Sequence, residues 1–227
     1  MDTLIKESVS FPAVAVFDFD GTLVQSNQIK IDTYFTITRE LVGAEEFLKD
    51  LLNSDPGLDR YGVTRRIAET FFPRQDQDRV SEELVRHYTE VCDRLIAIAP
   101  EVQGATAILQ RLHQSNVMLF VSSATPQTLI SDLVQSRDWG VYFQRCYGSP
   151  NTKISHLQEI HRLTNCEKDQ MLMIGDSWVD YSAACSFGCR FMGVGRALKA
   201  SQYDHPCGSN LEELGPSIFG ISTSELC

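Results

Sequence analysis

The chain has 227 residues, of which 43% are hydrophobic and 22% charged, which suits either one α/β domain or a core domain that carries a smaller insertion. Thirty acidic against twenty basic residues give a net charge of −10, which argues against a protein that coats nucleic acid or an anionic membrane. No apolar run approaches the ~20 residues that a helix needs to span a bilayer.

The cysteines and the first residues bear on the compartment. The seven cysteines are scattered, without the paired spacing of a zinc or redox motif. Residues 1–8 lack the charged-then-apolar layout of a signal peptide. We therefore expect reduced thiols and a cytoplasmic protein.

Five short apolar segments predict strands, and helical patterns separate the later ones. The expected strands are 13–17, 117–121, 143–147, 171–174 and 190–194. The expected helices between and before the later strands are 101–115, 126–135, 153–163 and 179–187. Most strand segments are continuously apolar, as in strands buried on both faces of a sheet. This alternation predicts a doubly wound parallel α/β sheet. Beyond residue 202 the pattern predicts no element.

The interval between the first strand and residue 101 breaks the alternation. Helical periodicity fits four segments in it, at 29–41, 44–52, 61–71 and 78–98. Because a structureless loop of that length is improbable, we expect a helical subdomain inserted after the first strand. The expected domains are an α/β core of residues 1–24 and 100–227 and a helical cap of residues 25–99. The two connections should lie close together in space, as a hinged lid requires.

Two pairs of aspartates follow predicted strands. The segment FDFDGTL places Asp18 and Asp20 directly after the first strand. The segment GDSWVD places Asp176 after the fourth strand and Asp180 one helical turn later. Because open α/β sheets bind ligands at the carboxyl ends of their strands, we expect all four side chains at one edge. A polar turn or an ordinary helix start is the simpler explanation for either segment alone.

Two further segments predict anion-binding groups at the same edge. Lys153 stands in the first turn of a helix, where an exposed cation costs about 0.3–1 kcal/mol unless an anion lies nearby. The segment VSSATP ends the second strand and places the Ser122 and Ser123 hydroxyls and free backbone N–H groups before a helix. Alone, each of these features is typical of a solvated lysine or of a helix cap.

Together, these four segments resemble the haloacid dehalogenase (HAD) superfamily in their order, spacing and placement at strand ends. The resemblance covers residues 13–28 and 101–194 well. It implies a Rossmann-like core, and the helical insertion matches in kind the small cap that this superfamily places after its first strand. An acidic chain with such a cap is similar to the phosphoglycolate phosphatases, a group whose members accept varied sugar and organic phosphates.

The resemblance implies a phosphatase that hydrolyses a small phosphate monoester. A cluster of four aspartates would repel a phosphate, so a divalent cation is needed, and oxygen ligands favour Mg²⁺. By resemblance, Asp18 and Asp176 give carboxylate oxygens to Mg²⁺ and Asp20 gives its backbone carbonyl. Asp18 is then the nucleophile that forms an aspartyl phosphate, and Asp20 is the general acid and base. Asp180 would orient a bound water or Lys153.

The resemblance also implies a set of phosphate-binding groups. Lys153, one serine hydroxyl and the backbone N–H groups of Phe19 and Ser123 would hold the transferring oxygens. The hydroxyl comes from Ser122 or Ser123, and Ser122 is preferred because it directly ends the apolar run.

Asp20 distinguishes among related activities. In this superfamily the haloacid dehalogenases and phosphonatases have no Asp at that place, whereas phosphatases and phosphomutases do. A phosphatase is therefore the first hypothesis and a sugar phosphomutase the second. A non-catalytic binding module is the third, although no motif carboxylate is missing from the chain.

The cap is the expected place of substrate selection. Residues 60–74 hold four arginines and one acidic residue, a local net charge of +3. Arg60 and Arg65 could bind a substrate carboxylate or second phosphate through bidentate pairing, or could belong to a solvated helix face. The expected partner is a small phosphorylated metabolite, with no nucleic acid and no membrane. The sequence shows no interface, and a monomer is favoured.

The histidines of the predicted helix 153–163 do not form a metal motif. His156 and His161 are five residues apart, so one helical face would not present both to zinc. We expect both to be solvated.

Overall fold

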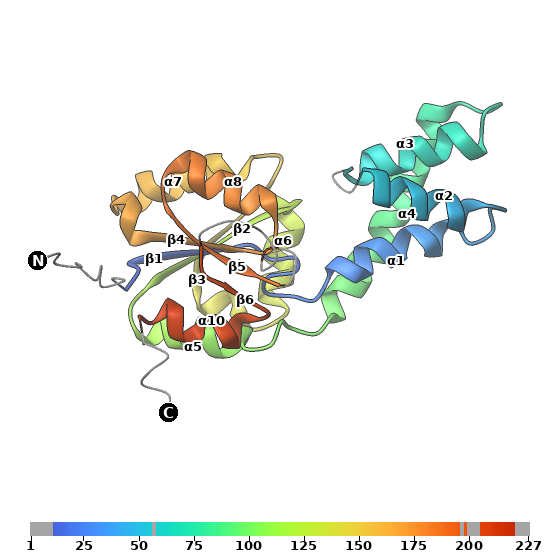
Figure 1. Cartoon of the computed structure of the whole chain (residues 1–227). Coiled ribbons are helices and arrows are strands. Elements are labelled where there is room, and N and C mark those ends of the chain that lie inside the picture. The colour runs from blue at the N-terminus through green and yellow to red at the C-terminus, as the bar shows by residue number, and fades with distance from the viewer. Residues whose placement is uncertain (1–10, 56–57, 196–197, 199–204, 221–227) are drawn as a thin grey trace, which may run out of the picture. The chain divides into compact units, whose positions relative to one another are not determined.

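The computed structural model describes residues 11–55, 58–195, 198 and 205–220 (Figure 1). The chain divides into two compact units, one of residues 1–25 and 100–227 and one of residues 26–99. The N-terminal segment examined for a signal peptide lies outside the described residues. Within them, no helix combines the length and the apolar character needed to cross a lipid bilayer.

The first unit is built on a sheet of six parallel strands in the order β3-β2-β1-β4-β5-β6. The strand bounds are β1 Val14–Phe17, β2 Met118–Pro126, β3 Phe143–Ser149, β4 Met171–Gly175, β5 Arg190–Val194 and β6 Cys207–Gly208. The predicted doubly wound α/β sheet is therefore confirmed. The order reverses direction at β1, so the carboxyl ends of β2, β1 and β4 lie side by side.

Helices cover both faces of this sheet (Figure 1). Helices α7 (Lys153–Thr164) and α8 (Trp178–Phe187) pack together on one face, and α5 (Ala105–Gln114) and α10 (Leu211–Ile218) on the other. Helix α6 (Gln127–Gln135) packs against β2 and β3. Alternate residues of a strand point to opposite faces, so Val14, Val16 and Phe120 join the buried cluster under α7 and α8. The central strands are thus buried on both sides.

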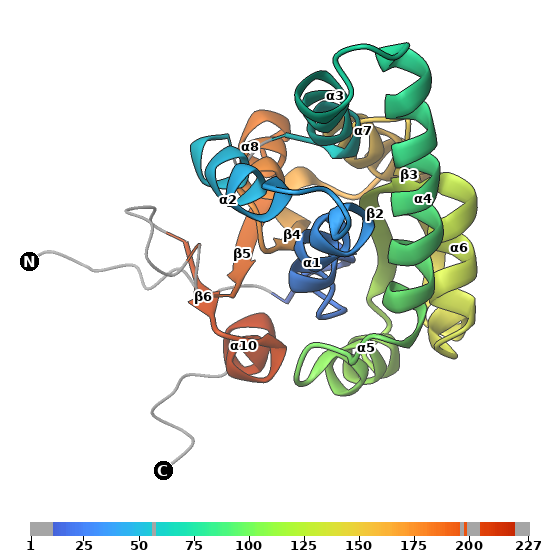
Figure 2. The ribbon, with the colours of Figure 1, turned by 90° about the vertical axis from the view of Figure 1, so that its right-hand side faces the viewer.

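The second unit contains the helices α1 (Asn27–Thr38), α2 (Ala44–Ser54), α3 (Arg60–Phe71) and α4 (Gln77–Ile98). Helix α4 packs along α1 and α3 (Figure 2). The interior of this unit includes the stacked rings of Tyr34 and Tyr88, whose centroids lie 4.4 Å apart, and an edge-to-face contact between Phe47 and Phe71. All four helices agree with the helical periodicity of the sequence to within a few residues.

The two chain crossings between the units lie next to each other in the first unit. The backbone N–H of Gln25 donates to the carbonyl of Pro100 at 3.0 Å, and the Gln25 side chain donates to the carbonyl of Glu101 at 2.9 Å. Val24 and Glu101 also form an isolated β-bridge. The expected closeness of the two connections is therefore observed.

Candidate active site

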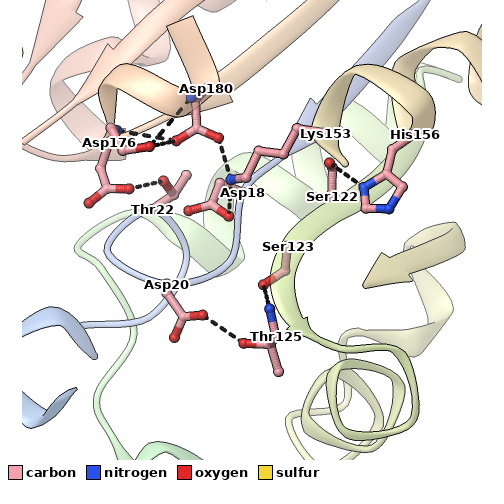
Figure 3. A network of polar contacts seen from close by, with 11 residues as sticks. Asp18, Asp20, Thr22, Ser122, Ser123, Thr125, Lys153, His156, Asp176 and Asp180 are labelled. Carbon is pink, nitrogen blue, oxygen red and sulfur yellow. Dashed lines mark hydrogen bonds and ion pairs between the residues drawn. The ribbon is translucent and has the colours of Figure 1, made fainter. Parts of the chain in front are cut away.

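The sheet topology gathers the predicted site residues at one edge of the first unit (Figure 3). Phe17 pairs with Val121 on β2 and with Ile174 on β4, and the backbone N–H of Asp18 donates to the carbonyl of Ile174 at 2.8 Å. The segments that follow these three strands therefore leave the sheet together. Lys153 joins them from the first turn of α7.

Lys153 lies between two buried aspartates, Asp18 directly after β1 and Asp180 in the first turn of α8. Its Nζ donates to Asp18 Oδ1 at 2.6 Å and also to Asp180 Oδ1 (Figure 3). The side chains of Lys153, Asp18 and Asp180 are 9%, 7% and 0% exposed. The anionic partners that would offset the unfavourable helix dipole are thus present, as the sequence argument required.

Burial and crowding shift the proton affinities of this cluster. Burial raises the pKa of Asp18 well above its usual range; Lys153 opposes the rise, and Asp180, Asp176 and Asp20 add to it. Burial by itself would lower the pKa of Lys153, but the charges and hydrogen bonds of Asp18 and Asp180 outweigh it, and the pKa rises above its usual value. One lysine therefore does not neutralise the surrounding carboxylates.

The start of α8 holds Asp180 in a fixed position. Ser177 and Asp180 form a reciprocal capping box, in which the Asp180 N–H donates to Ser177 Oγ and the Ser177 N–H donates to Asp180 Oδ2. The Ser177 hydroxyl also donates to Asp180 Oδ2, at 2.6 Å. Gly175 approaches the Asp180 carboxyl so closely that a Cβ atom at this position would collide with it. Asp176, which precedes this cap, is half-buried and accepts a hydrogen bond from Thr22 at 3.5 Å.

The acidic side chains fit a divalent metal ion. Asp18, Asp176 and Asp180 each offer a carboxylate oxygen, and these oxygens lie within 4.8 Å of one another. Hard oxygen donors with excess negative charge suit a cation such as Mg²⁺ or Ca²⁺. Asp180 lies within this acidic cluster, where its carboxylate oxygens also accept hydrogen bonds from Lys153 and Ser177.

Asp20 points away from this cluster and toward the end of β2 (Figure 3). Its side chain is buried at 7% exposure and accepts a hydrogen bond from Thr125 Oγ1 at 2.9 Å. A tight turn places it there: Gly21 has φ +79° and donates its N–H to the carbonyl of Val24 at 2.7 Å. A positive φ is accessible to glycine without steric cost, which explains Gly21 after the second aspartate.

The two serines at the end of β2 have different partners. The Ser122 hydroxyl and His156 Nδ1 share a hydrogen bond of 2.9 Å in the interior (Figure 3). The Ser123 hydroxyl accepts a hydrogen bond from the Thr125 N–H at 3.0 Å. Ser122 follows Phe120 by two residues and so faces α7, whereas Ser123 faces the other way. The structure does not bring the preferred hydroxyl, that of Ser122, to the aspartates.

His156 is a correction to the sequence interpretation. It was expected to be solvated, but only 2% of its surface is exposed, and its ring stacks on Tyr147 with centroids 5.4 Å apart. Burial lowers its pKa, and nearby Lys153 acts in the same direction. The signal that could have found it is the two-residue period of β2, which directs Ser122 toward α7.

The candidate arginines of the second unit already have partners there. Arg65 is ion-paired with Glu69, at 3.0 Å, and with Asp78. Arg60 lies over the ring of Tyr88, 5.5 Å from its centroid, and donates to Thr89 at 3.1 Å. Two carboxylates already neutralise Arg65, so Arg60 is the better candidate for binding an anion.

The family comparison covers most of the chain. The model of the family described as haloacid dehalogenase-like hydrolase matches residues 15–194. This range includes the four aspartates, Lys153 and the whole helical unit.

Curated relatives and solved structures agree with this match. A phosphoglycolate phosphatase of Salmonella typhimurium is 28% identical over 83% of this chain and 85% of its own length, and one of Pseudomonas savastanoi pv. phaseolicola is 24% identical over 91% and 75%. A HAD-superfamily hydrolase structure from Geobacter sulfurreducens has a TM-score of 0.67 at 18% identity and covers 93% of this chain and 98% of that one. At that identity the structure shows the fold alone.

Proposed function

Because the chain belongs to the haloacid dehalogenase-like hydrolase family, we propose that it hydrolyses a small phosphate monoester through an aspartyl phosphate on Asp18. Its class, a phosphoric monoester hydrolase, follows from the family and from the curated phosphatases that it resembles. The observation that carries the proposal is the buried arrangement of Asp18, Lys153, Asp176 and Asp180 beside Asp20.

Asp18 is the proposed nucleophile. Its carboxylate oxygen attacks phosphorus, and the bond from phosphorus to the substrate oxygen breaks. Lys153 supports the ionised form of Asp18 and lies where it can also contact a phosphoryl oxygen.

Asp20 is the proposed acid and base. It gives its proton to the departing oxygen, so the alcohol leaves uncharged. In the second half Asp20 takes a proton from water, the water oxygen attacks phosphorus, and the bond from Asp18 to phosphorus breaks. Inorganic phosphate leaves, and both aspartates return to their starting states.

Mg²⁺ is the proposed cofactor. Asp18 and Asp176 would hold it through carboxylates, Asp20 through its backbone carbonyl, and Asp180 would orient Lys153 or a bound water. When bound, the ion would offset the charge of the aspartates and of the phosphate.

Ser123 is the proposed source of the phosphate-binding hydroxyl, in place of Ser122. Its oxygen accepts the Thr125 N–H, which leaves the hydroxyl hydrogen to be donated to a phosphoryl oxygen. The backbone N–H groups of Phe19 and Ser123 complete the proposed set. Ser122 instead ties β2 to α7 through His156.

The helical unit is the proposed cap and the substrate a small phosphorylated metabolite. The phosphoglycolate phosphatases among the relatives support a substrate that carries a carboxylate, for which Arg60 is the proposed partner. The described cysteines are free thiols, which supports a cytoplasmic location.

The test is an assay of released phosphate from p-nitrophenyl phosphate with Mg²⁺. We expect activity that EDTA abolishes, and a loss of about 10⁴-fold or more in Asp18→Asn. Asp132→Asn, an exposed substitution on α6, is the matched control and should retain activity. Near wild-type activity in Asp18→Asn would show that the nucleophile is misassigned. Isomerised sugar phosphate without free phosphate would indicate the phosphomutase.

A further inference from the structure

Thr125, near the end of β2, contacts Asp20 after β1 and Ser123 in β2 itself. Its hydroxyl donates to Asp20 Oδ2 at 2.9 Å, and its backbone N–H donates to Ser123 Oγ at 3.0 Å (Figure 3). Only 4% of its surface is exposed. A single residue therefore contacts both the proposed acid and the proposed phosphate-binding hydroxyl.

The backbone around Thr125 is held firmly by the neighbouring strand. The register between β2 and β3 shifts between Ser122 and Pro126, which turns this segment out of regular pairing. At Gly148 a Cβ atom would lie 2.5 Å from the Thr125 carbonyl oxygen, so only glycine allows this approach. Gln127 accepts from the Gly148 N–H at 2.8 Å and donates to the Cys146 carbonyl at 2.9 Å. The backbone that carries the Thr125 hydroxyl is therefore packed against the end of β3.

The partners of the two aspartates differ in kind. Asp18 has a cation, Lys153, which favours its ionised form. Asp20 has a neutral hydroxyl, which can donate to a carboxylate and can also accept from a protonated acid. Such a partner fixes the direction of the side chain in both states that an acid and base must visit.

We propose that Thr125 is a positioning residue that directs the Asp20 carboxyl toward the departing substrate oxygen. This inference rests on the proposed function, since it assigns Thr125 an effect only through Asp20. Without the hydroxyl, the Asp20 carboxyl would lose this contact, and proton delivery to the leaving oxygen would slow.

The experiment compares Thr125→Val and Thr125→Ser on two substrates, p-nitrophenyl phosphate and an alkyl phosphate. The alkyl oxygen is a poor leaving group and depends on protonation, whereas p-nitrophenolate leaves readily. For Thr125→Val we expect kcat on the alkyl phosphate to fall by about tenfold to a hundredfold. The loss on p-nitrophenyl phosphate should be much smaller. Thr125→Ser should recover most of the activity, and Thr128→Val, an exposed control on α6, should change neither substrate.

A double-mutant cycle with Asp20→Asn separates positioning from general damage to the fold. If Thr125 acts through Asp20, Thr125→Val adds no further loss in the Asp20→Asn background. A full additional loss there, or equal losses on both substrates, would overturn the inference. Thr125→Ala, which leaves space and no clash, takes the place of Thr125→Val if that variant unfolds.

The outcomes distinguish this inference from the proposed function. A wild-type protein that hydrolyses neither phosphate refutes the proposed function itself. A wild-type enzyme whose Asp20→Asn variant depends on the leaving group, while Thr125→Val does not, overturns the role of Thr125 alone.

Discussion

The sheet edge of the first unit and the helical unit use the same kinds of charged residues in opposite ways. At the sheet edge of the first unit, Lys153 pairs with two aspartates that are distant from it in sequence. Each of these three side chains is less than 10% exposed. In the helical unit the ion pairs are exposed and mostly join neighbouring turns of one helix. They include Lys49–Glu45, Arg65–Glu69, Arg79–Glu83 and Arg86–Glu90.

The difference lies in what each pair does for the protein. An exposed pair gains little because water screens it, and it can be lost without consequence. A buried pair contributes weakly as a pair but is costly to break, since one charge remains in the interior. Buried charge is therefore concentrated where the chemistry is proposed, and the helical unit carries charge that water already stabilises.

The largest expected effect comes from breaking the buried pairs. Lys153→Met leaves Asp18 and Asp180 without their cation, and we expect a loss of stability of about 3–5 kcal/mol in metal-free protein together with loss of phosphatase activity. The free energy of unfolding, measured in urea with EDTA, checks this. Mg²⁺ should restore part of the stability of the variant, because it offsets the same carboxylates.

Lys49→Met is the matched control for that substitution. Lys49 also pairs with an acidic residue, but its side chain is 60% exposed. The urea midpoint of unfolding of the Lys49→Met variant should therefore equal that of the wild type within error. Equal losses in the two variants would show that burial does not separate the two units as described.

A smaller effect should come from pH through His156. The pKa of His156 is lower in the folded protein than in the unfolded chain, so the unfolded chain binds the proton more readily. The contribution of neutral His156 to stability is therefore fully present above the unfolded pKa of about 6.5. As pH falls from 6.5 toward the lower folded pKa, the free energy of unfolding should decrease by up to about 1.4 kcal/mol per pH unit, and it should level off below the folded pKa. His156→Gln should reduce this slope, measured by urea unfolding between pH 7.5 and 5.

His87, exposed on α4 in the helical unit, provides the comparison. The same measurement on His87→Gln is the control for the substitution itself. If His156→Gln left the pH dependence of the wild type unchanged, the burial argument for His156 would be contradicted.

The smallest effects should be those of the arginines in the helical unit. Arg60→Ala should raise KM for carboxylated phosphate monoesters by about tenfold and leave neutral monoesters unchanged, since a bidentate contact is lost. Arg65→Ala should change neither KM, because Arg65 is already paired with Glu69 and Asp78. Steady-state kinetics on the two substrate classes checks both, and an equal response to Arg60→Ala would remove Arg60 from substrate binding.

The sequence was most informative where periodicity is strong. The five predicted strands and the eight predicted helices are present, because buried parallel strands and amphipathic helices have clear patterns. The sequence pattern predicted no element near the end of the chain, where the structure has β6 and α10. Strand β6 has only two residues and helix α10 contains Pro216, so neither gives a clear hydrophobic period. A strand that short is recognised only from its pairing with β5.

The site was predictable as a set of residues and less so as an arrangement. The placement of Asp18, Asp176 and Lys153 follows from strand order, because carboxyl ends of neighbouring parallel strands meet at one edge. The choice between Ser122 and Ser123 depends on which face of β2 each occupies, and the apolar run did not settle it. His156 contacts Ser122, and Thr125 contacts Asp20, through hydrogen bonds between elements far apart in sequence. The two-residue period of β2 indicates which face Ser122 occupies, but it does not identify the partner of either residue.

The hydrogen bonds between Gln25 and the backbone at Pro100 and Glu101 have a consequence for local unfolding. The helical segment begins and ends at points that these bonds hold together, so its loop is already closed within the first unit. Because the β1–β2 pairing and these bonds all lie within the first unit, we expect opening of helices α1–α4 to leave β1 and β2 in register. Local opening of the inserted helices is thus expected to leave the sheet intact.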